Sequence, residues 1–363
     1  MNKRSILKIF VIMLVLASAV FITFSKKYNT KGNIKKSFPN IIKDYNKINE
    51  ISFENKLEKY SLIKKNNEWY LKNYYNYPVD KKKINSFFLN LYDSNFLDTK
   101  ETDLKNYYKL GVSYPLHNEY EANRIKIFSI NNNILYDFIL GKSSSRKTDY
   151  NVNYFRNSNQ KLVYLLKNDL NIPKKEFSWI DTDLFKIDRL RIKEVSIKDM
   201  ISKSFLKIYR DSYGDNEYKF YDMPKGYKLI NNYSVNSLAA VFEGLEILDA
   251  IPYVTDPSNR SLKVLKNIKA STFDGLLLNF QLIKIKNDIY VRVRVKSDIK
   301  TRKELNLDDR KKIIGIPSMK KFKEVEEEEI NMKFGENWLY KFDEFSTEQF
   351  NKSVKNFIEK KSE

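Results

Sequence analysis

The chain has 363 residues and a formal net charge of +20, with 42% hydrophobic and 14% aromatic residues, 9 Gly and 8 Pro. This composition supports globular cores and excludes a low-complexity or collagen-like chain, and the length indicates two domain-sized units. The absence of cysteine excludes thiol nucleophiles, disulfides, iron–sulfur clusters, cysteine-ligated zinc and a lipidated N-terminal cysteine.

The positive charge does not by itself predict a nucleic-acid partner. Lys outnumbers Arg by 54 to 12, and Lys lacks the rigid fork with which Arg reads phosphate and guanine. Abundant Lys, Asn, Ile, Tyr and Phe together are also typical of an AT-rich coding sequence. We therefore expect solvated lysines on many faces and no nucleic-acid partner.

The first expected element is a membrane anchor at residues 1–25. Ile9–Phe24 is a run of sixteen residues without a charge, eleven of which are Ile, Leu, Val or Phe. With the four residues before it, the run reaches about 20 residues, which matches a hydrocarbon core of about 30 Å. The alternative is a signal peptide that is cleaved at Ala17-Ser18-Ala19.

Charge counting does not fix the orientation of this span, because basic residues flank both of its ends. A short leader usually stays in the cytoplasm, and long domains translocate largely regardless of charge. We therefore expect a single-pass protein of the inner membrane, with the bulk of the chain extracytoplasmic, in the periplasm.

After a linker at residues 26–48, we expect two similar α+β lobes, at residues 49–180 and 181–360, each an antiparallel sheet with packed helices. An internal repeat predicts this duplication, because the strand pattern of Ile51–Phe53 recurs 144 residues later at Val195–Ile197. A β-hairpin follows in each copy, the first with an Asn66-Asn67 turn.

A helix follows each hairpin. Its apolar residues recur with i, i+3, i+4, i+7 spacing, which is typical of a helix packed on a sheet. Asp80 and Ser234 are the expected N-caps, and a short second helix is expected after each, at 101–109 and 258–266. The apolar stripes are Ile84, Phe87, Phe88 and Leu91 in the first copy and Val235, Leu238, Ala239 and Phe242 in the second.

Both copies then continue as strands, at 124–130, 134–140, 152–156 and 162–166 in the first and at 276–285 and 289–296 in the second. In the last strand, Val alternates with Arg292, Arg294 and Lys296, which indicates one buried and one solvated face. The chain is expected to end in a Glu-rich helix at 322–334 and a helix that begins at a Ser346…Gln349 capping box and carries residues 350–358.

No catalytic, cofactor-binding or metal-binding constellation stands out, so we expect a protein without a cofactor and without enzymatic activity. Gly141-Lys142-Ser143 ends like a P-loop, but Tyr136 stands where the motif needs its first Gly. His117 is the single histidine, and no G-x-S-x-G motif accompanies it.

Acidic residues leave alternatives open. Asp181 and Asp183 would share a face on a strand, where like-charge coupling supports acid–base chemistry. The other interpretation is a turn in which Trp179 packs and the Asp side chains accept backbone amides. Glu326–Glu329 is interpreted as the solvated side of a helix, and Asp274-Gly275 as a turn between strands.

Several segments within residues 50–360 carry a family resemblance: Glu68–Leu71, Pro78–Asp80, Tyr108–Val112, Leu140–Lys142, Trp179–Asp181, Thr272–Leu276, Ile330-Asn331 and Trp338–Tyr340. Together they resemble the bacterial family catalogued as domain of unknown function 4340. The resemblance implies a signal-anchored extracytoplasmic protein, often found beside ABC-transporter components of the gliding-motility auxiliary type. It implies no catalytic residues.

We therefore expect a non-enzymatic accessory subunit that binds a membrane-protein partner, such as an ABC-transporter component. The alternative is a module that binds an envelope lipid or glycan through the cationic strand face of residues 292–296, provided that these cations converge with Arg189, Arg191 or Lys286 on one concave surface. A hydrolase that uses the acidic pair beside Trp179 is a third hypothesis.

Overall fold

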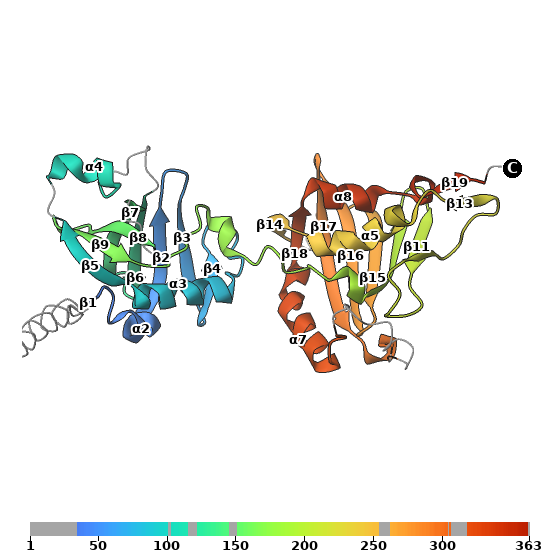
Figure 1. The fold of residues 1–363 in the computed structure, drawn as a ribbon, viewed down its shortest axis with the longest axis horizontal. Helices are drawn as coiled ribbons and strands as arrows, with labels where there is room; N and C mark the ends of the chain where they lie inside the picture. The colour runs from blue at the N-terminus through green and yellow to red at the C-terminus, as the bar shows by residue number, and fades with distance from the viewer. Residues whose placement is uncertain are drawn as a thin grey trace, which may run out of the picture. The chain divides into compact units, whose positions relative to one another are not determined.

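The computed structural model describes residues 35–100, 103–114, 122–144, 151–253, 262–303, 305 and 318–361 (Figure 1). The chain divides into two compact units, a first lobe (up to Tyr70, and Val79–Trp179) and a second lobe (Leu71–Pro78, and from Ile180 onward). Within the described ranges, no helix has the length and apolar character needed to cross a membrane. The expected span at Ile9–Phe24 and the single histidine, His117, lie outside those ranges.

The first lobe contains, in chain order, β1 (Lys35–Lys36), α2 (Ile41–Asp44), β2 (Ile48–Glu54), β3 (Lys59–Lys65), β4 (Glu68–Leu71), α3 (Lys81–Asp93), β5 (Asn95–Lys100), α4 (Tyr107–Leu110), β6 (Asn123–Ser129), β7 (Ile134–Ser143), β8 (Val152–Asn157) and β9 (Val163–Lys167). Its strands form a nine-stranded sheet in the order β1-β5-β9-β8-β7-β6-β2-β3-β4. The β3–β4 hairpin turns at Asn66 and Asn67, whose φ angles of 51° and 65° are those that a tight two-residue turn requires.

The second lobe contains β10 (Ile192–Asp199), β11 (Phe205–Tyr209), β12 (Lys219–Phe220), β13 (Tyr227–Leu229), α5 (Asn232–Gly244), β14 (Ile247–Pro252), β15 (Val264–Thr272), β16 (Leu276–Ile285), β17 (Asp288–Ser297), α7 (Phe322–Lys333), β18 (Trp338–Phe342), α8 (Glu344–Asn351) and β19 (Ile358–Lys360). Eight of these strands form a sheet in the order β12-β11-β10-β15-β16-β17-β18-β14, and β13 pairs with β19.

The two large sheets have the same strand order. Read in reverse, the order of the second sheet is β14-β18-β17-β16-β15-β10-β11-β12. These strands correspond one by one to β5-β9-β8-β7-β6-β2-β3-β4 of the first sheet. The irregularities match as well, because equivalent strand pairs shift register at Glu50 and Glu194 and again at Asp98 and Asp249. The fold is therefore sheet-rich and mostly antiparallel with a few helices, and one plan occurs twice.

Each sheet buries one face under helices. All eight apolar residues of the two predicted helical stripes are buried in α3 and α5. In the second lobe, the Phe280 ring of β16 lies 5.4 Å from Phe242 of α5 and 6.0 Å from Phe350 of α8. Figure 1 shows α5 and α8 together over the strands of this sheet. The opposite face of the sheet is therefore free to carry polar side chains.

The cap of α5 corrects the sequence interpretation. The helix begins after Asn231, whose side-chain oxygen accepts a hydrogen bond from the backbone N of Ser234 at 2.7 Å. Ser234 therefore lies in the first turn and is not the N-cap. Asn231 stands four residues before Val235, as the N-cap Asp80 stands four residues before Ile84 in α3.

The expected final helix is also corrected. Helix α8 begins after Asp343, whose carboxylate accepts from the backbone N of Ser346 at 2.9 Å. This cap lies three residues before the expected Ser346, so the helix starts earlier than expected. It ends at Asn351. Residues 358–360 are not helical but pair as β19 with β13. The Glu-rich helix is confirmed as α7.

Two further segments differ from expectation. Part of the expected linker forms β1 and α2, because Phe38 and Ile41 are buried and the Phe38 ring packs 4.9 Å from that of Phe138. The second of the expected short helices is wrong from Val264 onward, where β15 begins, and residues 254–261 lie outside the described ranges.

Replacing Asn231 with Ala is expected to lower the stability of the second lobe by about 0.5–2 kcal/mol, because an amide of the first turn loses its acceptor. The matched variant Ser234→Ala keeps this cap and loses the exposed hydrogen bond that its own hydroxyl donates to the Asn231 carbonyl at 2.8 Å, so it is expected to cost less, about 0.5 kcal/mol. Thermal unfolding followed by circular dichroism compares the two variants. An equal or larger loss with Ser234→Ala would contradict the assignment of the cap.

Candidate functional site

The candidate site lies on the polar face of the second sheet. Asn279 of β16 is the cross-strand partner of Lys269 on β15 and of Arg294 on β17, so the three side chains form one row. Ser271 and Lys296 flank Leu277 in the next row. Directly opposed side chains in such rows stand about 5 Å apart at Cβ. The two rows place three cations and two neutral polar groups together.

A groove of about 620 Å³ runs over these rows, which is a common size for a small-molecule site. Ser271, Leu277 and Asn279 line it from the sheet. Glu329 and Lys333 of α7 line its other side. Helix α7 therefore forms one wall of the groove.

Two polar atoms of this groove lack partners within the described residues. Ser271 Oγ and Asn279 Oδ1 are both buried, and neither has a hydrogen-bond partner there. Ser271 is only 7% exposed. Buried polar atoms are almost always hydrogen-bonded, so each exception needs an explanation. A bound ligand would supply the missing partners.

Three of the four cations that line the groove are also unpaired, whereas Lys333 lies 3.7 Å from Glu329. Lys269, Arg294 and Lys296 are exposed, and no described carboxylate lies within salt-bridge distance of them. The nearby acids are already engaged: Glu194 pairs with Lys207 at 2.9 Å, and Glu329 accepts a hydrogen bond from the Ser297 backbone N at 2.8 Å. Glu336 also lines the groove, so with Lys333 the lining holds four cations and three carboxylates, and its net charge is positive by one.

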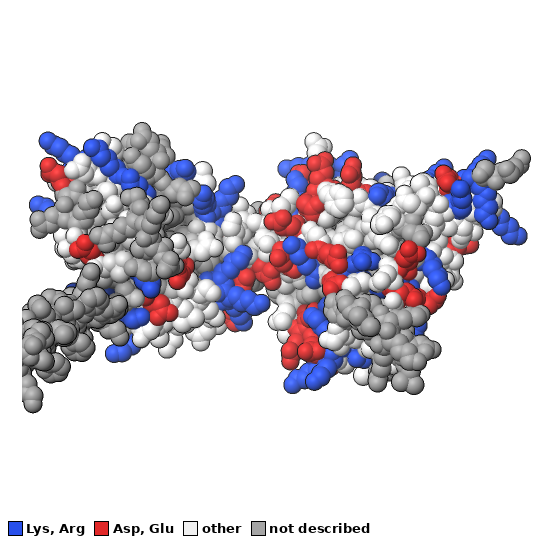
Figure 2. Space-filling view, viewed as in Figure 1, with Lys and Arg blue, Asp and Glu red and all other residues white. Residues whose placement is uncertain are grey.

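This positive charge acts on a neighbouring residue. Burial, and then repulsion by Arg294, lower the pKa of Arg292. The Arg292 guanidinium lies 3.7 Å from the centre of the Tyr253 ring, where the ring face compensates part of its charge. On the face drawn in Figure 2, both basic and acidic side chains are visible on each lobe.

Helix α7, the wall of the groove, lies beside the part of β17 that β18 leaves unpaired. Strand β18 pairs with β17 only at Val291 and Arg292. Beyond that point the edge amides of β17 meet carboxylates: the Val295 N donates to Glu336 at 3.3 Å and the Ser297 N to Glu329 at 2.8 Å. A free strand edge must be covered or paired, and here acidic side chains cover it.

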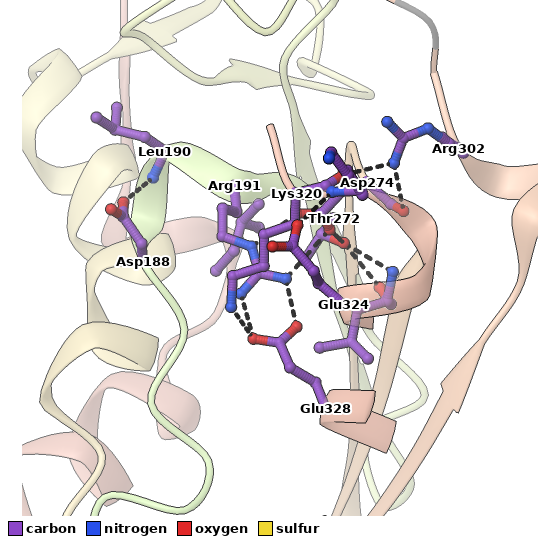
Figure 3. A network of polar contacts seen from close by, with 12 residues as sticks. Asp188, Leu190, Arg191, Thr272, Asp274, Arg302, Lys320, Glu324 and Glu328 are labelled. Atoms are coloured by element: carbon purple, nitrogen blue, oxygen red, sulfur yellow. Dashed lines mark hydrogen bonds and ion pairs between the residues drawn. The ribbon is translucent and has the colours of Figure 1, made fainter. Parts of the chain in front are cut away.

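A buried ion-pair network fixes α7 in this position (Figure 3). Arg191 Nε lies 2.8 Å from an oxygen of Asp274, in the β15–β16 turn, and its terminal nitrogens lie 2.9 and 2.6 Å from the two oxygens of Glu328 on α7. Thr272 donates to the same Asp274 carboxylate at 2.5 Å, and Lys320 contacts Glu328. Asp274 is completely buried.

The burial of Arg191 lowers the pKa of its guanidinium, but the hydrogen bonds to Glu328 and Asp274 outweigh burial, so the pKa is raised overall. The guanidinium therefore stays charged. Breaking one arm of such a buried pair leaves an uncompensated charge, which costs about 3–5 kcal/mol. The position of α7 beside the groove thus depends on this network.

The first lobe has the same row with different chemistry. Ser52, Lys126 and Asp137 stand where the second lobe has Ser196, Lys269 and Asn279, because the strand registers correspond. The Asp137 carboxylate is satisfied internally, since Arg124 Nε donates to it at 3.0 Å and Ser158 Oγ at 2.6 Å.

Although burial raises the pKa of the Asp137 carboxyl, these hydrogen bonds lower it overall. The equivalent oxygen of Asn279 has no partner in the described structure, and the neighbouring Arg294 has no carboxylate. A closed ion pair in one lobe therefore corresponds to an open, positively charged groove in the other.

The predicted cationic strand face is only partly brought together. Arg294 and Lys296 line the groove, whereas Arg292 packs on Tyr253. None of the expected additional cations joins them. Arg191 is held in its buried network, Arg189 donates to the backbone O of Asn216 at 3.2 Å, and Lys286 lies at the β16–β17 turn with a φ of 54°.

The acidic pair beside Trp179 lies in a turn. Trp179 is buried, and Asp181 accepts a hydrogen bond from the backbone N of Asp183 at 3.0 Å. The Asp183 carboxylate is exposed and lies 2.9 Å from Lys186. This geometry matches the turn interpretation, with Trp179 as the packed residue.

The P-loop-like segment Gly141-Lys142-Ser143 is the end of strand β7. A Cβ at Gly141 would collide with the carbonyl oxygen of Leu110 and lie 2.8 Å from Cγ1 of Val112. Gly141 is therefore required by close packing. It does not form the phosphate-binding turn of a P-loop.

Sequence reasoning missed Lys269, Ser271, Asn279 and the network of Arg191. The Glu326–Glu329 run shows why: its first two residues are exposed, but Glu328 enters the network and Glu329 covers the edge of β17. One signal was available. The β17 face was identified as cationic, and continuing the cross-strand pairing from it leads to Asn279 and Lys269.

The described residues contain no group of three or more His, Asp or Glu side chains arranged to hold a metal ion. A family model described as "Domain of unknown function (DUF4340)" matches residues 69–267, which is more than half of the chain. No curated protein and no solved structure matches the chain.

Replacing Asp274 with Asn is expected to lower the free energy of unfolding by about 3–5 kcal/mol, because Arg191 loses a buried charge partner. Asp183→Asn, which removes a carboxylate from the exposed pair with Lys186, is the control and is expected to cost less than about 1 kcal/mol. Urea unfolding of both variants tests this difference. Similar small losses in the two variants would show that the network does not stabilise the lobe.

Proposed function

The chain belongs to the DUF4340 family of domains of unknown function, and from that premise we propose that it is a non-enzymatic accessory subunit of a membrane system that holds an anionic ligand in the groove of its second lobe. The family match confirms the resemblance drawn from the sequence. The ligand-binding role goes beyond that match and is argued from the groove itself.

One observation carries the proposal. At equivalent positions of two lobes with the same plan, Asp137 is neutralised within its own sheet, whereas Asn279 leaves Lys269 and Arg294 without a carboxylate. Unpaired cations and unsatisfied polar atoms in one groove are suited to a ligand that brings negative charge and hydrogen-bonding groups.

The membrane part of the proposal is supported by the sequence. The uncharged run at Ile9–Phe24 is long enough to span a bilayer with its flanking residues. We propose that it anchors the chain in the inner membrane, with both lobes extracytoplasmic and with an ABC-transporter component as the membrane-protein partner. In this arrangement the groove would capture its ligand close to the membrane surface.

Reversing two groove charges, in the double variant Arg294→Glu/Lys296→Glu, is expected to weaken the binding of anions at least about tenfold, because like charges then face the ligand. The measurement is calorimetric titration of the full chain in mild detergent with citrate, inorganic phosphate, a poly-glutamate peptide and a galacturonic acid trimer.

The control is Lys284→Glu, which changes an exposed lysine at the end of β16, outside the groove. It is expected to leave the binding of these anions unchanged within about twofold. The proposal fails if the wild-type chain binds none of them, or if the control loses binding to the same extent as the double variant.

The anchor predicts that the intact, uncut chain sediments with membranes and resists extraction by carbonate and high salt, because burying an apolar span outweighs the screened surface charges. A reporter fused to the C-terminus should be active only in its extracytoplasmic form. An intact chain in the soluble fraction, or a reporter that is active only in the cytoplasm, would contradict the anchor or its orientation.

A further inference from the structure

We propose that the ligand of the groove is an acidic carbohydrate, and that Asn279 is the residue that makes the groove selective for it. This inference rests on the proposed anion-binding function and names its ligand class. It follows from three features of the groove: the chemistry of its floor, the position of its cations and the occupation of the β17 edge.

The floor of the groove, formed by Asn279 and Ser271, requires a ligand with hydrogen-bond donors. The unpartnered Oδ1 of Asn279 can only accept a hydrogen bond, and Ser271 Oγ can donate or accept. A simple carboxylate is ionised near neutral pH and has no donor for the Asn279 oxygen, and inorganic phosphate carries fewer P–OH donors than a sugar has hydroxyl groups. A sugar ring carries several hydroxyl groups, each of which is both a donor and an acceptor.

The cations around the floor of the groove require a ligand that carries negative charge. Lys269 and Arg294 stand on either side of Asn279, and Lys296 follows Arg294 two residues along β17. Adjacent strands are about 4.8 Å apart, so the three cations surround the floor at distances that a carboxylated sugar unit can bridge. A uronic acid places a carboxylate and several hydroxyls on one ring, which fits both the rim and the floor.

The edge of β17 disfavours a peptide. An extended peptide would bind by adding a strand to a free edge. The edge amides of Val295 and Ser297 are already bound to Glu336 and Glu329. The groove therefore offers the face of the sheet and not its edge. The side chains of that face are one amide, one hydroxyl, Leu277 and three cations, and the acids Glu194, Glu329 and Glu336 line the groove around them.

Asn279 decides the charge of this face. In the first lobe its counterpart Asp137 places a carboxylate in the same row as Lys126 and binds Arg124, which stands two residues before Lys126 on β6. An aspartate at position 279 would stand between Lys269 and Arg294 and would bring a negative charge next to both cations. The neutral amide keeps both cations available and adds an acceptor for a hydroxyl group.

The test is calorimetric titration of the full chain in mild detergent with a galacturonic acid trimer, with a neutral galactose trimer and with a poly-glutamate peptide. Wild-type chain is expected to bind the acidic trimer at least about 100-fold more tightly than the neutral trimer. Asn279→Asp should weaken this binding at least about tenfold, and Ser271→Ala about fivefold through one lost hydrogen bond.

Two controls separate ligand binding from folding. Asn279→Ser keeps the position neutral but removes the amide oxygen, so it is expected to weaken binding of the acidic trimer by about fivefold, less than Asn279→Asp, and Lys284→Glu should leave binding unchanged. Thermal unfolding of each variant without ligand establishes that the second lobe is folded. Loss of binding in Asn279→Ser as large as that in Asn279→Asp would overturn the role of charge at this position.

The other possible titration results each contradict one part of the carbohydrate proposal. Equal affinity for the neutral trimer shows that the cations are not used, and equal or tighter binding of poly-glutamate identifies an acidic peptide as the ligand instead. If citrate or phosphate binds in a manner that depends on Arg294 and Lys296 while the acidic trimer does not bind, the carbohydrate inference fails and the proposed anion-binding function stands.

Discussion

The second lobe depends on the burial of one positive charge. Arg191 sits between the carboxylates of Asp274 and Glu328, so it joins the start of β10, the β15–β16 turn and helix α7. One guanidinium between two carboxylates leaves an excess negative charge, which Lys320 neutralises through Glu328. Removing any one of these charges would leave another uncompensated in a poorly solvated site. The network therefore determines where α7 lies.

Fixing α7 has two effects on the sheet. Its acidic residues cover the part of β17 that β18 leaves unpaired, which closes an edge that would otherwise invite strand addition. The same helix rises beside the polar face and converts it into a groove. Helix α7 lies in the connection between β17 and β18, where the first lobe joins β8 to β9 directly. The candidate site thus occurs where the second lobe departs from the shared plan.

Much of the fold follows from local sequence patterns. The helical stripes, the Asn66-Asn67 turn and the strands from Arg124 to Leu166 are set by side-chain periodicity and turn chemistry, which act over a few residues. Helix caps are harder to predict: Asn231 and Ser234 are both good capping residues, and only the spacing to Val235, compared with Asp80 and Ile84, distinguishes them. The repeat contained this information.

The site was far less predictable, because it depends on pairing between distant strands. Nothing local to Asn279 indicates that it stands between Lys269 and Arg294, and the pairing of Arg191 with Glu328 joins residues 137 positions apart. The Glu-rich run indicated a solvated helix face, which is correct for Glu326 and Glu327 but not for the two residues that follow. Charge compensation over long sequence distances is not visible in residue spacing.

The shared strand order carries a hazard during folding, since a hairpin from one lobe fits the place of its counterpart in the other, and such misassembly is typical of repeated domains. The different residues in the equivalent rows, Asp137 in the first lobe and Asn279 in the second, disfavour such an exchange of hairpins between the lobes. If β16 took the place of β7, Asn279 would stand beside Arg124, whose side chain is only 13% exposed and would lose its carboxylate. The loss of that ion pair would penalise the wrongly assembled chain relative to the native one.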